Sequence, residues 1–421
     1  MFNISRRAMM KDGLLVVTAG MIMPSIFGRA VRAAHNAAQD GDRYAFDAQG
    51  RTLIVVQMAG GNDGLNTIVP YTDSLYYQAR PTLAIHQKDV ITLDDRLGLN
   101  PALQALKPFW DQQKFAIVEG VGYPNPSLSH FQAMDIWQTL DMNGQGGDGW
   151  LGKYVAGLVD KDGHPFQALD IGVQLPTALR AINAQVPTVV QPKTYQLAPD
   201  VKSPAALNAR TQALLRLYDS YPKTAPYAAL LDATAQNAQQ GASQLQQADA
   251  AYKPAVTYPK GSFAAGLEVL AEAICQGLGL RVGYITLGGF DTHANQAKDQ
   301  PALLQTLAEG VSAFYADLAA HGKADDVVIM TWSEFGRRVH QNGNDGTDHG
   351  TAAPLFVLGN AVTGGFYGEP PDLSSLDQTG NLKFTIDFRQ VYATVLDRWL
   401  GASSQAVLGG SYGNQAFLPA A

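Results

Sequence analysis

The sequence has 421 residues, of which 46% are hydrophobic and 16% are charged. This balance excludes a disordered chain, because it supplies enough apolar surface to build a large core. The formal net charge of −7 argues against a general nucleic-acid-binding protein, since phosphate contacts require clustered Lys and Arg side chains.

The beginning of the chain has the pattern of an export signal. Arg6 and Arg7 are followed by a moderately apolar segment at 13–27 and by a small-x-small cleavage site at 31–33. Glycine and proline interrupt the apolar part, which disfavours the alternative, a membrane anchor of about 20 residues. We therefore predict a twin-arginine signal peptide over 1–33, export to the periplasm or the extracellular space, and no stable membrane span after processing.

The rest of the chain alternates between apolar runs and helical patterns. Helical spacing is found between the runs, most clearly at 301–322, where leucines and aromatic residues share one face. This alternation predicts an α/β fold with a doubly wound, mostly parallel sheet. The five expected strands are 52–60, 114–122, 281–289, 325–333 and 353–359.

One stretch does not follow this alternation. Residues 204–252 are rich in Ala and Gln and poor in aromatic residues, which indicates a helical excursion, whereas 160–203 contains several prolines and suggests an irregular segment. No internal repeat is visible. We predict a single α/β domain over 50–401 that carries an irregular and helical insertion at about 160–252.

Cys275 is the only cysteine in the sequence. An intramolecular disulfide is therefore impossible, and so is a zinc site built from two or four thiolates. The residue lies in an apolar helical stretch, which favours a buried structural thiol over a nucleophile. Any metal would have to be held mainly by oxygen and imidazole ligands.

Acidic and imidazole side chains gather near the expected strand ends. Because the carboxyl ends of parallel strands meet at one edge of a sheet, these side chains could form a cage for one or two divalent ions. Each pair taken alone is equally well explained by a turn or a loop hydrogen bond, and their joint occurrence favours the cage. The candidate ligands are Asp63, Asp291, His293, Glu334, Asp348 and His349.

Several peptides of this sequence resemble the DUF1501 family of exported bacterial proteins. The resemblance covers residues 50–401 and rests on GGNDGLNTIVP, NPSLSHFQAMDIWQT, GGFDTH, TWSEFGRR, DHGTAAPLFVLG and DFRQVYATVLDRWLG. The family is grouped with the alkaline phosphatase superfamily of phosphatases, sulfatases and phosphomutases. The resemblance thus implies an alkaline-phosphatase-like fold, with a metal site beside a nucleophile at the start of a helix.

The resemblance also implies roles for individual residues. Asp63 is similar in position to the first metal-binding Asp, and Ser129 to the nucleophile, where a helix N-terminus would help to hold a phosphate or sulfate. Asp291 and His293 would serve one metal, although one residue separates them where the family's superfamily pattern has three. His349 resembles the late His of that same metal.

The peptide TWSEFG departs from the superfamily pattern Asp-His-Gly. It has Glu334 in place of the Asp and Phe335 in place of the His. Phe cannot bind a metal, so the second metal site lacks an imidazole unless His130 or Asp348 replaces it. A site with one metal or none is therefore open, and such a protein could act in binding instead of catalysis.

The function implied by the resemblance is an exported metal-dependent hydrolase of phosphate or sulfate esters. Zinc is the favoured ion, with manganese, magnesium and calcium as alternatives, and the substrate would be a small-molecule or polymer ester. Ser129 would attack phosphorus or sulfur, and Arg337 would neutralise charge on the ester oxygens. His130 would be a second base or ligand.

Each of these catalytic residues also has a structural interpretation. Ser129 is at least as well explained as a helix cap, and Arg337 as a surface or ion-pair residue. Two further functions stay open: a non-catalytic exported binding or assembly protein on the same fold, and a structural metalloprotein that binds calcium.

Overall fold

The computed structural model describes residues 50–159, 166–181, 184–192, 203–220 and 228–420, together with Phe46, His164 and Tyr195. The expected signal peptide at 1–33 lies outside the described residues. Within these ranges, no helix combines the length and the apolar character that crossing a membrane requires.

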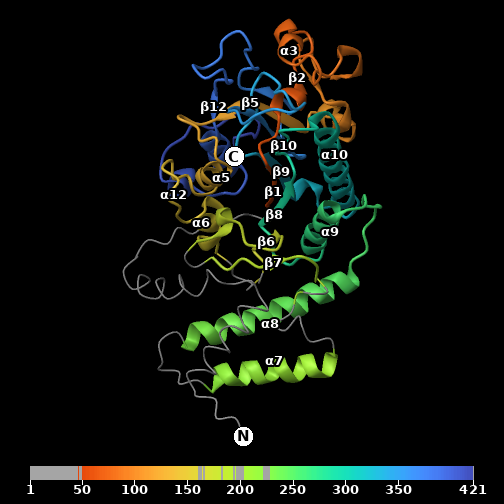
Figure 1. The fold of residues 1–421 in the computed structure, drawn as a ribbon. Coiled ribbons are helices and arrows are strands. Elements are labelled where there is room, and N and C mark those ends of the chain that lie inside the picture. Colours follow the sequence, from red (N-terminus) through yellow and green to blue (C-terminus); the bar gives the residue numbers. More distant parts are fainter. Residues whose placement is uncertain are drawn as a thin grey trace.

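A nine-stranded mixed sheet forms the centre of the molecule (Figure 1). Its strands are β1 (Thr52–Ala59), β5 (Phe115–Gly122), β6 (Ala168–Ile171), β7 (Thr188–Val189), β8 (Val282–Gly288), β9 (Val327–Trp332), β10 (Ala353–Leu358), β11 (Gly365–Tyr367) and β12 (Ile386–Asp387). The order is β11-β5-β10-β9-β1-β8-β6-β7, and β12 pairs with β5. Strand β10 runs antiparallel to both of its neighbours, whereas the other pairs are parallel.

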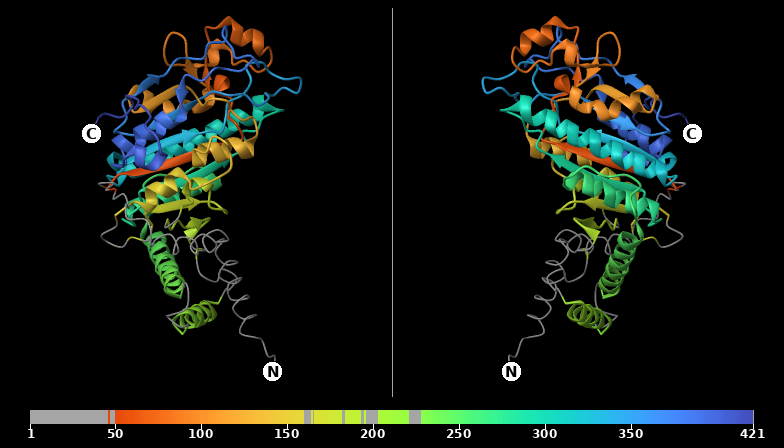
Figure 2. Two further views of the ribbon diagram at one scale, coloured as in Figure 1. Left: turned by 90° about the vertical axis from the view of Figure 1, so that its left-hand side faces the viewer. Right: turned by 90° about the vertical axis from the view of Figure 1, so that its right-hand side faces the viewer.

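Helices cover both faces of this sheet, as Figure 2 shows. One face carries α9 (Ser262–Cys275) and α10 (Gln296–Ala320). The opposite face carries α5 (His130–Thr139), α6 (Trp150–Ala156), α11 (Phe388–Arg398) and α12 (Ser404–Leu408). Alternate side chains of β1 point to opposite faces: Ile54 and Val56 pack with the first group, and Leu53 and Val55 with the second. The prediction of an α/β fold with a mostly parallel sheet is confirmed.

The segment at 160–203 contributes more regular structure than its prolines suggest. Strand β6 pairs with β8, and β7 pairs with β6, so two short strands of this segment extend the main sheet. Beyond β7 lie α7 (Pro204–Asp219) and α8 (Ala228–Ala251), below the sheet in Figure 1. Short edge strands tolerate prolines, which explains why the sequence pattern hides them.

The remaining elements lie at the top of Figure 1 and around the rim. A small antiparallel sheet joins β2 (Ile68–Val69), β4 (Gly98–Leu99) and β3 (Ile91–Thr92). The short helices are α3 (Ser74–Ala79) and α4 (Lys107–Asp111), and the 3-10 turns are Gly64–Asn66, Gln87–Asp89, Pro101–Leu106, Thr177–Leu179 and Ala324–Asp326.

Cys275 is the last residue of α9 and is half-buried. Burial raises the pKa of its thiol to about 11, and the nearby carboxylate of Asp317 acts in the same direction. The thiol is therefore protonated at neutral pH, which fits the structural role expected from the sequence.

Candidate functional site

The strand order brings several loops to one edge of the sheet. Strands β1, β8 and β9 are parallel neighbours, so the loops that follow them leave from the same edge. Because β10 is antiparallel to β9, its first residue lies at that edge as well. An isolated antiparallel bridge between Arg337 and His349 then joins the beginning and the end of the loop that connects β9 to β10.

Three side chains from these loops and from α5 form a group that could hold a metal ion. His130, Asp291 and His349 each offer one ligand atom, and these atoms lie within 4.8 Å of one another. His130 Nε2 lies 3.4 Å from Asp291 Oδ1, and His349 Nε2 lies 3.2 Å from the same oxygen. The two imidazole rings meet edge to face, with 4.4 Å between their centroids.

The other ring nitrogen of each imidazole, Nδ1, is hydrogen-bonded to the protein. His130 Nδ1 lies 2.8 Å from Oε1 of Glu334, a side chain that is 1% exposed and also accepts from the Gly60 amide. His349 Nδ1 lies 2.7 Å from the carbonyl oxygen of Leu128. Both acceptors require a proton on Nδ1, so both Nε2 lone pairs are directed toward Asp291. Metal-binding histidines are typically oriented in this way.

The donor set fits a divalent cation. His130 Nε2 is buried and has no hydrogen-bond partner among the described residues. Two imidazole nitrogens and a carboxylate oxygen would repel one another at these distances unless a cation or a proton lay between them. Burial lowers the pKa of His349, which disfavours the proton. Imidazole and carboxylate together suit zinc and similar borderline ions.

Asp291 is the centre of the cluster. Its Oδ1 is 2.8 Å from His293 Nδ1 and 2.7 Å from Nη2 of Arg337. Partial burial opposes its ionisation, but the hydrogen bond from Arg337 and the positive charge of that guanidinium outweigh this effect and lower its pKa to about 2. Asp291 is therefore a carboxylate throughout the physiological pH range, as a metal ligand must be.

Arg337 has a different role from the one expected. Its guanidinium is 2% exposed and donates to the carbonyl oxygens of Gly60, Gly61, Phe290 and Thr347 as well as to Asp291. Between them these acceptors engage Nε, Nη1 and Nη2, so every nitrogen of the buried guanidinium donates to a group of the protein. The expectation that Arg337 neutralises charge on a bound ester therefore does not fit. The residue positions Asp291 and joins three loops.

Asp63 is not brought into the cluster. Its two carboxylate oxygens accept from both terminal nitrogens of Arg80, and one of them also accepts from the Gln296 amide. Asp63 and Arg80 are both almost completely buried. The expectation of a metal ligand at Asp63 is corrected on this ground, because a buried guanidinium already compensates its charge.

Asp348 also points elsewhere. Its side chain is exposed, and its Oδ1 accepts from the side-chain amide of Asn342 at 3.0 Å. Its carbonyl oxygen accepts from the Arg338 amide. Asp348 thus makes the loop hydrogen bond that the sequence left open as its alternative, and it adds no ligand to the cluster.

Two neighbours of the cluster shape its surroundings. Ser129 is exposed at the N-cap position of α5, directly before His130, and its hydroxyl makes no capping hydrogen bond. The ring of Phe335 lies against both imidazoles, with centroids 4.8 Å from His130 and 4.6 Å from His349. Phe335 therefore forms an apolar wall where the superfamily pattern would have an imidazole. A cavity of about 330 Å³ borders Glu334 on another side.

Replacing Glu334 with Gln is expected to weaken metal binding by about 10- to 100-fold, because the charge that orients and polarises His130 is lost. Competition with a chromogenic chelator would measure the affinity. Asp348→Asn removes one carboxylate from the same region without touching the cluster, so it should leave the affinity unchanged. Equal affinities for Glu334→Gln and the unaltered chain would contradict this assignment.

Comparison with solved structures finds distant structural similarity. The PsFucS1 sulfatase from Pseudoalteromonas sp. has a TM-score of 0.36 and 10% sequence identity over 93% of this chain and 77% of the sulfatase. The lipoteichoic acid synthase LtaP from Listeria monocytogenes has a TM-score of 0.28 and 9% identity over 87% of this chain and 74% of its own. No curated protein matches the sequence. The family model described as "Protein of unknown function (DUF1501)" matches residues 115–409, more than half of the sequence, and the chain therefore belongs to the DUF1501 family.

Proposed function

We propose that this protein is a metal-dependent hydrolase of phosphate or sulfate esters, with zinc held by His130, Asp291 and His349. The orientation of the two imidazoles carries the proposal. Each ring is fixed through Nδ1 by a carboxylate or a carbonyl oxygen, and each directs Nε2 toward the same carboxylate. The two imidazoles also disfavour the calcium alternative, because calcium prefers sites made of oxygen ligands.

A divalent ion at this position would supply Lewis-acid polarisation of an ester oxygen. Ser129 is the nucleophile we assign, because it is exposed beside His130 and its hydroxyl is not used as a cap. Its Oγ would bond to phosphorus or sulfur while the bond to the leaving alcohol breaks, and water would then cleave the seryl ester.

The proton of the Ser129 hydroxyl needs an acceptor. His293 belongs to the cluster but lies outside the group of three ligands, is half-exposed, and is oriented by Asp291 through Nδ1. We assign it as the base, and the leaving alcohol takes up a proton from water. The N-terminus of α5 would add favourable electrostatics for the anionic ester.

The site of action and the partner are also proposals. The signal pattern at 1–33 supports export to the periplasm or the extracellular space. The open position of Asp291 and Ser129 suits a small ester or the end of a polymer, since both side chains are exposed. The negative net charge does not suit nucleic acid.

Hydrolysis of 4-nitrophenyl phosphate and 4-nitrophenyl sulfate by the zinc-loaded full chain tests the proposal. One of the two esters should release 4-nitrophenol well above the rate without protein, and Ser129→Ala should reduce turnover by at least about 100-fold. Ser243→Ala, an exposed serine on α8, is the control and should keep full activity. A zinc-loaded chain that hydrolyses neither ester would contradict the proposal.

Two observations favour a second candidate, a non-catalytic exported binding or assembly protein. Phe335 covers the imidazoles on one side, and Asp63 is paired with Arg80, so the residues for a second metal are lacking in the described part of the chain. In that case zinc would bind stoichiometrically without ester hydrolysis. The same assay therefore separates the two functions.

A further inference from the structure

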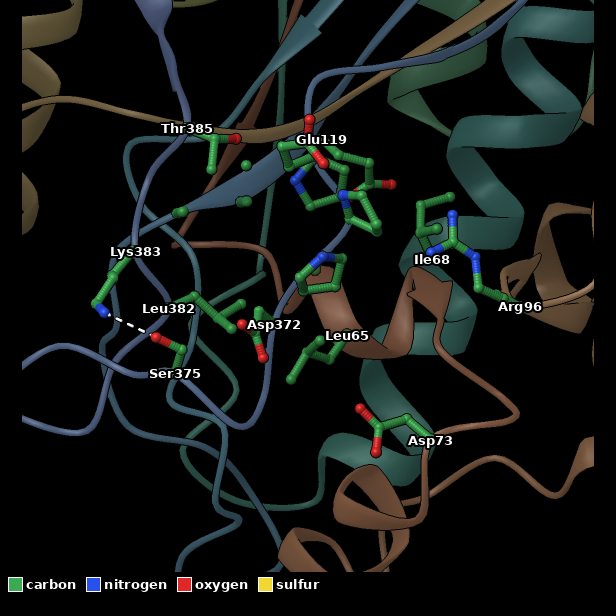
Figure 3. Close-up of a pocket in the computed structure, with 18 residues that line it drawn as sticks. Leu65, Ile68, Asp73, Arg96, Glu119, Asp372, Ser375, Leu382, Lys383 and Thr385 are labelled. Atoms are coloured by element: carbon green, nitrogen blue, oxygen red, sulfur yellow. Dashed lines mark hydrogen bonds between the residues drawn. The ribbon is translucent and has the colours of Figure 1, made fainter.

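A larger cavity lies apart from the histidine cluster (Figure 3). Its volume is about 530 Å³, which is in the range of small-molecule sites. Strand β5, the turn after β1, the start of β10 and the loop at 369–385 enclose it. None of the three candidate metal ligands lines this cavity, so it is a separate feature of the molecule.

A β-bulge in β5 directs one side chain into the cavity. Val118 pairs with Leu355 and Val121 pairs with Ala353, so two residues of β5 face a single residue of β10. Gly120 adopts φ +63°, the left-handed conformation that glycine allows and that such bulges use. In a regular strand, Val118 and Val121 would point to opposite faces of the sheet, because they are three positions apart. The extra residue at the bulge places both side chains on the same face, where they pack in one cluster.

The side chain at the bulge is Glu119, the one charged residue in an otherwise apolar strand. It is 3% exposed, and its Oε1 is buried without a hydrogen-bond partner. Figure 3 places Glu119 and Thr385 at one end of the cavity and Asp73 at the other. A buried carboxyl oxygen with no partner costs free energy, and a ligand that donates a hydrogen bond to it would offset that cost.

The lining has two chemical characters. Leu65, Ile68, Leu382 and three prolines supply apolar surface. The charged groups favour a cation, because four carboxyl groups line the cavity against two basic side chains. Asp73 and Asp372 accept from the amides of Leu75 and Ser374, and Lys383 donates to Ser375, whereas Oε1 of Glu119 has no partner. The acids are Asp73, Glu119, Glu369 and Asp372, and the bases are Arg96 and Lys383.

We propose that this cavity binds a primary amine carried on a compact apolar body, with the ammonium group donating to Glu119 and the body packed against the prolines and leucines. The inference goes beyond the proposed hydrolase, because it assigns a second site with its own ligand. It would hold equally for a catalytic or a non-catalytic protein.

Binding of an ammonium group has a measurable consequence for protons. Burial raises the pKa of Glu119 to about 8, and the nearby charge of Asp94 acts in the same direction. Below that pH, Glu119 is therefore neutral when no amine is bound. A bound ammonium group stabilises its ionised form. One proton is therefore released to solvent for each amine bound, and affinity rises as the pH approaches 8 from below.

Calorimetry of the full chain with benzylamine and with benzyl alcohol tests the inference. Benzylamine should bind with a dissociation constant on the order of 1 mM or tighter, and benzyl alcohol much more weakly. Glu119→Gln keeps the shape of the side chain and should weaken benzylamine binding by at least about tenfold. Glu309→Gln, an exposed residue on α10, removes the same charge elsewhere and should have no effect.

A second measurement keeps the test independent of how well Glu119→Gln folds. At about pH 6.5, titrations in two buffers with different ionisation enthalpies should show the release of about one proton per benzylamine. Equal affinities for the amine and the alcohol would overturn the inference, as would unchanged benzylamine binding by folded Glu119→Gln or binding without proton release. None of these outcomes depends on ester hydrolysis, so the inference and the hydrolase can fail separately.

Discussion

Replacing His130 with Asn is expected to abolish stoichiometric zinc binding while the protein stays folded. His130 contributes a buried Nε2 that no other described group satisfies, and its ring is fixed by Glu334. Loss of a direct ligand should exceed the effect of losing its outer partner, so zinc affinity should fall by more than about 100-fold, or more than about 2.7 kcal/mol. If the hydrolase is correct, activity falls in parallel.

Elemental analysis after gel filtration would measure this effect, with circular dichroism to confirm the fold. His340→Asn is the matched control, because it removes an exposed imidazole from the loop after β9 without touching the cluster. The control should keep about one zinc ion per chain. If His130→Asn and the control retain equal amounts of zinc, then His130, Asp291 and His349 do not form a metal site.

The sequence predicts the edge of the sheet at which this cluster forms, for a clear physical reason. Long apolar runs identify β1, β5, β8, β9 and β10, and parallel strands place their following loops together. Asp291 and His349 therefore meet as expected, whereas Glu334, expected as a ligand, contacts the cluster through Nδ1 of His130. His130 was expected only as a second ligand or base, because a His at a helix start carries no signal of what faces it.

The errors have a shared cause, which is that sequence patterns do not reveal the partners of a side chain. Asp63 follows a strand as expected. Arg80, at the end of α3, donates hydrogen bonds to both carboxylate oxygens of Asp63. Arg337 donates to backbone carbonyls of two other loops and of its own loop. The carbonyl of Leu128, which orients His349, has no side-chain signature at all.

The buried pair of Asp63 and Arg80 leads to the largest expected effect on stability. Replacing Asp63 with Asn should lower the free energy of unfolding by about 3 to 5 kcal/mol, because a guanidinium would remain buried without a compensating charge. Zinc content should stay unchanged, since the metal group lies elsewhere. Urea unfolding and elemental analysis of the same sample would measure both quantities.

Two further variants make this prediction decisive. Asp63→Asn combined with Arg80→Met removes both charges and should recover part of the lost stability, because neither ion is then left alone. Glu309→Gln removes an exposed charge and should change stability by less than about 0.5 kcal/mol. Loss of zinc from Asp63→Asn at unchanged stability would reverse the assignment, since that is how a metal ligand behaves. The stability and the metal content of this one variant therefore decide whether Asp63 supports the fold or serves the site.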